Sequence, residues 1–170
     1  GSVDVLTQVY DRSILYETYT SSTCGPCNPG NVNFNSVVAN YPNEFVSVKY
    51  QQNFPGTGDP YTTDETVNRR GYYAINSIPR LEIDGGWDGN SGSLTGAIHQ
   101  SYKGIPAFVE IDADYSVSGQ TVTINMDIDA VKDYTGMKLY VVIFEKLTTM
   151  NVKTNGETQF EHVVKKMLPN

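Results

Sequence analysis

The sequence has few basic residues and no long apolar run. Only 12 of its 170 residues are Lys or Arg, against 19 Asp or Glu, which gives a formal net charge of −7. Nucleic-acid binding relies on clustered basic side chains, so this balance argues against a nucleic-acid partner. No stretch approaches the ~18 consecutive apolar residues of a membrane-spanning helix. The 12 Tyr and the 39% hydrophobic content argue against disorder and predict a folded chain.

Cysteine is also scarce, because the chain contains only Cys24 and Cys27. One pair cannot supply the disulfide framework that stabilises many small secreted domains. Zinc sites generally use four ligands, and the other soft candidates, His99 and His162, lie far away along the chain. We therefore expect no metal and no cofactor. A structural disulfide and a redox-active pair are the interpretations that remain.

Residues 13–51 have the pattern of a β-α-β unit. Residues 13–20 alternate in polarity and are rich in β-forming side chains, which predicts a strand. Apolar residues then recur at helical spacing until Tyr41-Pro42, where the predicted helix ends. Residues 44–51 alternate again and predict a second strand. Such a unit favours a parallel strand pair with a right-handed crossover.

Further elements follow up to residue 104. Asp64 is predicted to cap a helix, because its carboxylate can accept from free backbone N–H groups. A strand is entered through Ile78-Pro79, and an amphipathic helix closes at Gly104. We expect His99 to lie on the surface of this last helix.

The pattern changes at Ile105-Pro106, and the rest of the chain predicts strands alone. Residues 109–117 and 122–130 alternate between apolar and polar residues, which predicts two half-buried antiparallel strands. Ser118-Gly119-Gln120 supplies the tight turn between them. Residues 139–144 are apolar on both faces and predict a central strand, and residues 160–167 predict a fourth strand.

These four strands are fewer than the ~7 of an immunoglobulin-like sandwich. We therefore expect an α/β domain at 1–104 followed by an incomplete antiparallel β domain at 105–170. An incomplete sheet has an unpaired edge, which makes a homodimer through this β extension a candidate interaction.

The strongest chemical signal is the motif Cys24-Gly25-Pro26-Cys27 at the start of the first predicted helix. Free N–H groups and the helix dipole stabilise an anion there. They lower the pKa of a thiol from ~8.5 towards the ~3.5–7.5 of active thiolates. The second sulfur lies about one turn inside the helix, where it can close a disulfide or resolve a mixed one. We expect Gly25 and Pro26 to contact substrate.

Ile78-Pro79 is the second part of the predicted site. A proline that opens a strand is unremarkable alone, and an ordinary strand-start proline is the alternative reading. With a C-x-x-C motif in a β-α-β unit, it predicts a cis-proline loop that faces the sulfurs. A cis X-Pro bond turns the preceding backbone outward, where Ile78 can pair with an extended polypeptide.

These segments together resemble the thioredoxin superfamily over residues 10–104. The resemblance is carried by the strand from Ile14, by the Cys24–Cys27 motif and by the segment 73–85 around Ile78-Pro79. It implies an α/β thioredoxin-like fold, with Cys24 as the nucleophile, Cys27 as the resolving thiol and Pro79 as the cis-proline.

Residues 154–169 are similar to a family of thioredoxin-like proteins of Gram-negative envelopes and outer membranes. In that family a β-sandwich domain follows the thioredoxin-like domain and the chain continues further. The similarity implies an exported chain, in the periplasm or at the outer membrane or cell surface, and a fragment of a longer protein.

The sequence departs from thioredoxin before the first cysteine, and Asn28-Pro29-Gly30 after the motif weakens the start of the helix. Thr23 stands where thioredoxin has a tryptophan before the first cysteine. The segment before Cys24 is one residue longer, so the family's buried proton-transfer carboxylate matches Glu17 when aligned from Ile14 and Thr18 when aligned from Cys24. Glu17 is therefore a candidate general base for Cys27, with an outward-facing strand residue as the alternative.

Together these features predict a thiol–disulfide oxidoreductase that acts on protein disulfides in the cell envelope through Cys24 and Cys27. Its partners would be protein thiols or disulfides and a redox partner, and the direction of electron transfer is open. The alternative is a redox-inactive envelope module for binding or adhesion, in which the thioredoxin-like part serves as a scaffold.

Overall fold

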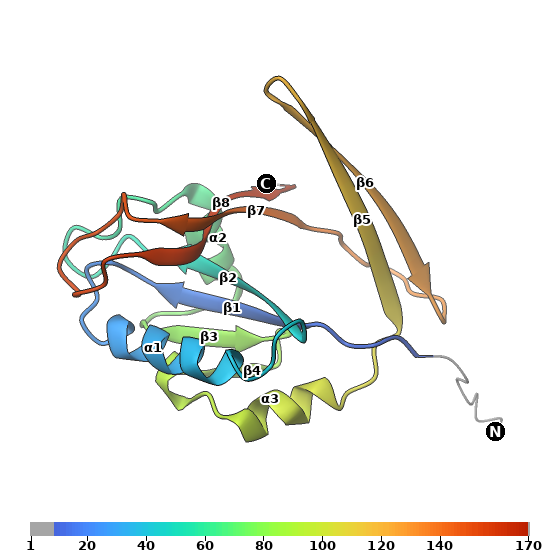
Figure 1. Cartoon of the computed structure of the whole chain (residues 1–170), viewed down its shortest axis with the longest axis horizontal. Helices are drawn as coiled ribbons and strands as arrows, with labels where there is room; N and C mark the ends of the chain where they lie inside the picture. Colours follow the sequence, from blue (N-terminus) through green and yellow to red (C-terminus); the bar gives the residue numbers. More distant parts are fainter. Residues whose placement is uncertain (1–8, 170) are drawn as a thin grey trace. The chain divides into compact units, whose positions relative to one another are not determined.

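The computed structural model describes residues 9–169, which divide into two units. Of these residues, the larger unit comprises 13–103 and 139–169. The smaller unit comprises 9–12 and 104–138. Each unit is described by itself (Figure 1).

The larger unit is built on a mixed six-stranded sheet with the strand order β4-β3-β1-β2-β8-β7. Strands β1, β2 and β8 are parallel to one another, whereas β3 is antiparallel to β1 and β7 is antiparallel to β8. The strands are β1 (Ile14–Thr20), β2 (Phe45–Gln51), β3 (Arg80–Ile83), β4 (Trp87–Gly89), β7 (Val141–Thr148) and β8 (Phe160–Leu168). The predicted parallel β-α-β unit is confirmed, because β1 pairs with β2 along its whole length.

Helices cover both faces of this sheet (Figure 1). They are α1 (Cys27–Val38), α2 (Asp64–Tyr72) and α3 (Gly96–Lys103), with a short 3₁₀ helix, η1 (Ser91–Ser93), before α3. Successive side chains of a strand point to opposite faces. Tyr16 of β1 accordingly packs against Phe34 of α1 on one face, and Tyr19 packs with Tyr50 and Tyr73 on the face that α2 covers.

The cap of α2 and the burial of one residue of α3 differ from the sequence prediction. Thr63, not Asp64, caps α2: its side chain accepts from the N–H of Thr66, whose hydroxyl in turn accepts from the N–H of Thr63. Asp64 is the first helical residue, where a carboxylate faces the positive end of the dipole. His99 of α3 was predicted at the surface but is fully buried, stacked on the ring of Tyr41 at 3.9 Å.

The predicted boundary between the two domains is wrong for the last thirty residues or so. We expected residues 105–170 to form one antiparallel β domain, but β7 and β8 complete the sheet of the larger unit. Strand β8 pairs with β2 at Lys49 and Val163, and Val163 is fully buried. Strand β7 lies at the edge of the sheet, whereas residues 139–144 were predicted to form a central strand. The local pattern of a strand does not specify which sheet that strand joins.

The smaller unit is the predicted hairpin of β5 (Val109–Ser118) and β6 (Thr121–Ala130). Its register places apolar residues opposite apolar residues, such as Ile111 opposite Ile128 and Tyr115 opposite Ile124. The alternate pairs are acidic or polar, such as Glu110 opposite Asp129. Because side chains alternate along a strand, the hairpin has one apolar face and one acidic face.

Candidate functional site

Cys24 and Cys27 lie in the turn that joins β1 to α1 and form a disulfide. Cys27 is the first residue of α1, and Pro26 precedes it with helical backbone angles. The turn is fixed locally, because the N–H of Cys24 donates to the carbonyl of Ser21 at 3.0 Å. The predicted placement of the motif at a helix N-terminus is confirmed.

The disulfide lies just below the surface. Cys24 is 2% exposed and Cys27 is 0% exposed, whereas Gly25 and Pro26 between them are exposed. A partner that approaches the sulfur atoms therefore meets the Gly25-Pro26 turn first. This position suits the predicted contact of both residues with substrate, which stays a prediction.

The second predicted element is next to the first. The Ile78–Pro79 peptide bond is cis, and the carbonyl oxygen of Ile78 lies 3.8 Å from Sγ of Cys24. A disulfide sulfur has no proton to donate, so this is a contact and not a hydrogen bond. The structure thus brings Cys24, Cys27, Ile78 and Pro79 together, whereas the roles of Ile78 and Pro79 in binding substrate stay predictions.

Gly30 allows α1 to approach the proline loop closely, and sequence reasoning missed this. A Cβ added at Gly30 would lie 2.5 Å from Oγ of Ser91 and 3.1 Å from Cγ of Pro79. Glycine is unfavourable inside a helix, and this close packing explains why a glycine stands near the start of α1. The Pro29-Gly30 dipeptide was the only signal in the sequence.

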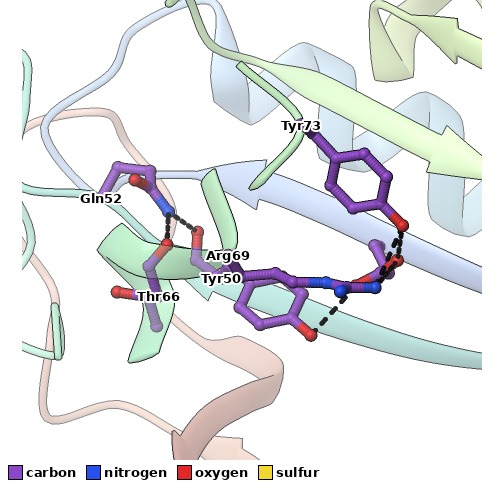
Figure 2. Close-up of polar contacts among 6 residues, drawn as sticks. Tyr50, Gln52, Thr66, Arg69 and Tyr73 are labelled. Carbon is purple, nitrogen blue, oxygen red and sulfur yellow. Dashed lines mark hydrogen bonds and ion pairs between the residues drawn. The ribbon is translucent and has the colours of Figure 1, made fainter. Parts of the chain in front are cut away.

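Glu17 does not lie where the sequence predicted it. Its buried carboxylate accepts from Nε of Arg69 at 2.7 Å and from Nη2 of Arg69 at 2.9 Å. The hydroxyls of Tyr73 and Tyr50 also donate to it, at 2.6 and 3.1 Å. Figure 2 shows Tyr50, Arg69 and Tyr73 converging on this one position.

The alternation of β1 explains the correction. Thr18 faces α1 together with Thr20, whose hydroxyl accepts from Asn31 of α1 at 3.1 Å. Glu17 therefore faces α2, on the side of the sheet opposite the helix that begins with Cys27. Within residues 9–169 its hydrogen-bond partners are Arg69, Tyr73 and Tyr50 and neither cysteine. The alternative of an outward-facing residue is also wrong, because Glu17 is buried.

The side chains that contact Glu17 keep their protonation states near neutral pH. Burial and the carboxylate of Glu17 raise the pKa of Tyr50 and of Tyr73, so both phenols remain neutral donors. Burial lowers the pKa of Arg69, but its hydrogen bond to Glu17 and the charge of Glu17 outweigh this and raise it. The arrangement is a buried ion pair with two extra donors, which holds α2 to β1.

A second group of residues that sequence reasoning missed holds the segment before the cysteines. The N–H of Ser22 donates to Oδ2 of Asp59 at 2.9 Å. The carbonyl of Ser22 accepts from the N–H groups of Thr154 and Asn155, at 3.0 and 2.9 Å. The side-chain amide of Asn155 also donates to the carbonyl of Ser21 at 3.1 Å. Asp59 and Asn155 come from loops that lie far apart along the chain, so no local pattern could indicate them.

A polar pocket lies beside α1, with one buried charged residue in its lining. Lys49 of β2 is buried, and its Nζ lies 3.4 Å from Oδ1 of Asn35. Burial lowers the pKa of Lys49, partly offset by the charges of Glu161 and Glu157. These four residues line a cavity of about 230 Å³.

The part of the chain that the structure describes contains no group of three or more His, Cys, Asp or Glu side chains that could hold a metal ion. Across residues 9–169, no helix combines the length and the apolar character needed to span a membrane.

Comparison with known proteins shows similarity of fold. No family model matches the chain, and no curated protein sequence matches it. Protein AGR_C_4864 from Agrobacterium tumefaciens superposes with a TM-score of 0.62 at 17% identity, over 93% of this chain and 72% of that one. HBP35 of Porphyromonas gingivalis superposes with a TM-score of 0.65 at 16% identity, over 94% of this chain and 57% of that one. The chain thus spans little more than half of HBP35.

Proposed function

We propose that the chain is a thiol–disulfide oxidoreductase whose larger unit has a thioredoxin-like fold. The observation that carries the proposal is the 3.8 Å contact between Sγ of Cys24 and the carbonyl of Ile78, at a cis X-Pro bond. A C-x-x-C disulfide at a helix N-terminus beside a backbone carbonyl suits the exchange of disulfides with an extended polypeptide.

The topology of the larger unit supports the thioredoxin-like part of the proposal. A parallel β1-α1-β2 unit is followed by α2 and by the antiparallel strands β3 and β4. Helices α1 and α3 share one face of the sheet and α2 lies on the other (Figure 1). The cysteines and Pro79 then meet at one end of the sheet, where β1 ends and β3 begins.

The chemistry follows from the positions of the two sulfur atoms. The thiolate of Cys24 attacks one sulfur of a substrate disulfide, so a Cys24–substrate bond forms, the substrate S–S bond breaks and the leaving thiolate takes up a proton. Deprotonated Cys27 then attacks Cys24, which closes the Cys24–Cys27 disulfide and releases the second substrate thiol. The substrate gains two electrons and two protons, and the dithiol loses them. The same steps in reverse oxidise a substrate dithiol.

The surroundings of the sulfur atoms assign roles to their neighbours. The positive end of the α1 dipole stabilises the thiolate of Cys24. The backbone at Ile78 offers hydrogen-bonding groups to an extended substrate, and Gly25 and Pro26 form the exposed turn that the substrate meets. The substrates are protein disulfides, and a second thiol protein restores the starting redox state.

We place this activity in the cell envelope, with export to the periplasm or to the outer membrane or cell surface. The resemblance of residues 154–169 to envelope proteins supports this placement, as does the low content of Lys and Arg. An antibody against the chain, applied to fractionated cells, tests it, and recovery in the cytosolic fraction alone would contradict it.

Insulin reduction with dithiothreitol as electron donor tests the enzymatic proposal. The wild-type chain should accelerate reduction, and Cys24→Ser should abolish the acceleration because it removes the attacking sulfur. Cys27→Ser should retain attack but not resolution, and so should accumulate mixed disulfides with substrate. A wild-type rate equal to that of Cys24→Ser, with alkylation of Cys24 at the rate of an ordinary thiol, would contradict the proposal.

One observation favours the second candidate, a binding or adhesion module that uses the larger unit as a scaffold. The β5–β6 hairpin exposes apolar side chains, among them Tyr115 at 74% and Val117 at 62%. Exposed contiguous apolar surface of this kind marks interaction sites. This candidate requires that Cys24 and Cys27 can both be replaced by Ser without loss of binding to the envelope fraction, which a pull-down measures.

A further inference from the structure

Asp59 is a buried carboxylate beside the turn that carries Cys24 and Cys27. It is 5% exposed, and its Oδ2 accepts the N–H of Ser22, two residues before Cys24. Its Oδ1 accepts the N–H of Tyr61 at 2.8 Å. The side-chain amide of Asn151 donates to both oxygens, at 3.3 and 3.1 Å.

All of these donors are neutral. Among the ion pairs within residues 9–169, none joins Asp59 to a Lys, Arg or His side chain. Three neutral donors hold the carboxylate in place but leave its negative charge without a counter-ion. Inside a protein the effective dielectric constant is low, so such a charge acts strongly on charges that form nearby.

The charge that forms two residues along the chain from this hydrogen bond is the thiolate of Cys24. The disulfide is neutral, whereas the reduced pair carries a negative charge when Cys24 ionises. A like charge in the neighbourhood disfavours that ionised form. The N-terminus of α1 acts in the opposite direction. The balance between the two decides how readily the disulfide is reduced.

We propose that Asp59 sets the redox equilibrium of the Cys24–Cys27 pair and biases it towards the disulfide. This inference rests on the proposed function, because it concerns the same pair of sulfur atoms. Asp59 touches neither sulfur and acts through its charge and through the backbone of Ser22, so it is a positioning residue. Its partner Asn151 and the neighbouring residue Asn155 come from the β7–β8 connection, which makes that connection part of the redox site.

The equilibrium with glutathione measures this bias directly. The disulfide of the chain reacts with two molecules of reduced glutathione to give the dithiol of the chain and one molecule of glutathione disulfide. Two electrons and two protons pass to the chain, and the new S–S bond forms between the two glutathione sulfurs. Alkylation after equilibration reports the fraction of reduced chain.

Asp59→Asn removes the charge at nearly constant shape. The amide oxygen can still accept from the N–H of Ser22, and the new NH2 can donate to Oδ1 of Asn151, which is buried without a partner, once Asn151 rotates. The NH2 cannot accept from the N–H of Tyr61, so that one hydrogen bond is lost. We expect the equilibrium constant for reduction to rise by about 10-fold, which equals a potential about 30 mV more oxidising. The pKa of Cys24 in the reduced variant should fall, as measured by the pH dependence of its alkylation.

Two matched variants separate charge from position. Asp64→Asn removes the same charge from an exposed carboxylate of α2, where solvent and salt screen it, and should leave the equilibrium unchanged. Asn155→Ala removes the hydrogen bond to the carbonyl of Ser21 without a change of charge. Its shift of the glutathione equilibrium should therefore be much smaller than that of Asp59→Asn. Circular dichroism establishes that each variant is folded.

Three results would each overturn the inference. They are an equilibrium of Asp59→Asn equal to that of the wild type, a shift in Asp64→Asn as large as that in Asp59→Asn, and a shift in Asn155→Ala of that same size. Failure of the proposed function is a separate result, because it shows as absent insulin reduction by the wild type. The glutathione equilibrium depends only on the chain's own cysteines and stays measurable in that event.

Discussion

At the scale of single residues, Glu17 is a buried charge that depends on partners from a distant helix. Removal of one partner of a buried ion pair costs about 3–5 kcal/mol, because the other charge is left uncompensated. The Arg69 side chain keeps 14% exposure, which favours the lower end of this range. We expect Glu17→Gln to lower the free energy of unfolding by about 3 kcal/mol in urea denaturation.

The same variant should leave the redox chemistry intact, because Glu17 faces α2 and not Cys27. Glu145→Gln, which breaks an ion pair with half-exposed Lys165 at the surface, is the matched control and should change stability little. A changed pH profile for the resolution step by Cys27 in Glu17→Gln would contradict a purely structural role for Glu17.

Glu82 makes stability depend on pH. Burial, a hydrogen bond with Asp88 and the charge of Asp88 raise the pKa of Glu82 from 4.5 to about 7. The folded state therefore binds more protons than the unfolded state between about pH 4.5 and 7, and the free energy of unfolding falls as the pH rises through this window. The loss should be on the order of 2 kcal/mol in wild type.

Urea denaturation at pH 5 and pH 8 checks this dependence. Glu82→Gln should remove most of the loss between the two pH values. Asp88 does not interfere, because its hydrogen bond to Arg80 lowers its pKa and keeps it charged throughout. An equal loss in the wild type and in Glu82→Gln would assign the dependence to other groups.

These residues show what the sequence could and could not predict. Cys24, Cys27 and the cis bond at Pro79 could be predicted, because their chemistry is tied to a short motif and its spacing. The face occupied by Glu17 could not, since a one-residue shift in alignment exchanges the two faces of a strand. His99 is buried, and its Nδ1 forms a hydrogen bond with the hydroxyl of Tyr16 on β1 at 2.8 Å. Tyr16 lies 83 residues away along the chain, so local periodicity could not indicate this partner.

At the scale of elements, the approach of α1 to the proline loop depends on Gly30. Gly30→Ala would place a methyl group 2.5 Å from Oγ of Ser91, a residue that is itself fully buried. Overpacking of this kind costs about 1–3 kcal/mol. We expect Gly30→Ala to destabilise the chain by about this amount and to slow insulin reduction, because Pro79 must also shift.

Gly71→Ala is the matched control, since Gly71 is helical and a Cβ there would have nothing within 4 Å. Alanine is about 1 kcal/mol more favourable than glycine inside a helix, so this variant should gain a fraction of that. The two variants should therefore shift the urea midpoint in opposite directions. A gain in stability for Gly30→Ala would mean that α1 can retreat from Pro79 without cost.

The elements themselves were largely predictable, whereas their assignment to a sheet was not. The β1-α1-β2 unit is fixed by local periodicity and by the rule for parallel crossovers. Strands β7 and β8 were predicted to share one antiparallel domain with β5 and β6, yet they join the sheet of the larger unit. Contacts between Lys49 of β2 and Val163 of β8 decide this, and they span more than a hundred residues.

At the scale of the whole molecule, the turn that carries Cys24 and Cys27 depends on both ends of the larger unit. Ser22 is held by Asp59 from the loop after β2 and by Asn155 from the connection between β7 and β8. The early part of this unit therefore cannot hold its cysteine turn in the observed way without the later hairpin. This dependence explains why the boundary at residue 104, which the change of sequence pattern indicated, does not separate two independent domains.

The smaller unit should be the less protected part of the molecule. A two-stranded hairpin alone is marginally stable, and segments with few buried side chains open most readily. In native-state hydrogen exchange followed by mass spectrometry, we expect the amides of β5 and β6 to exchange well before those of β1 and β2. Equal protection of the two sheets would contradict this, and would mean that the apolar face of the hairpin is covered in solution. Protection that falls on dilution would identify a second copy of the chain as the cover, and protection independent of concentration would place the cover within one chain.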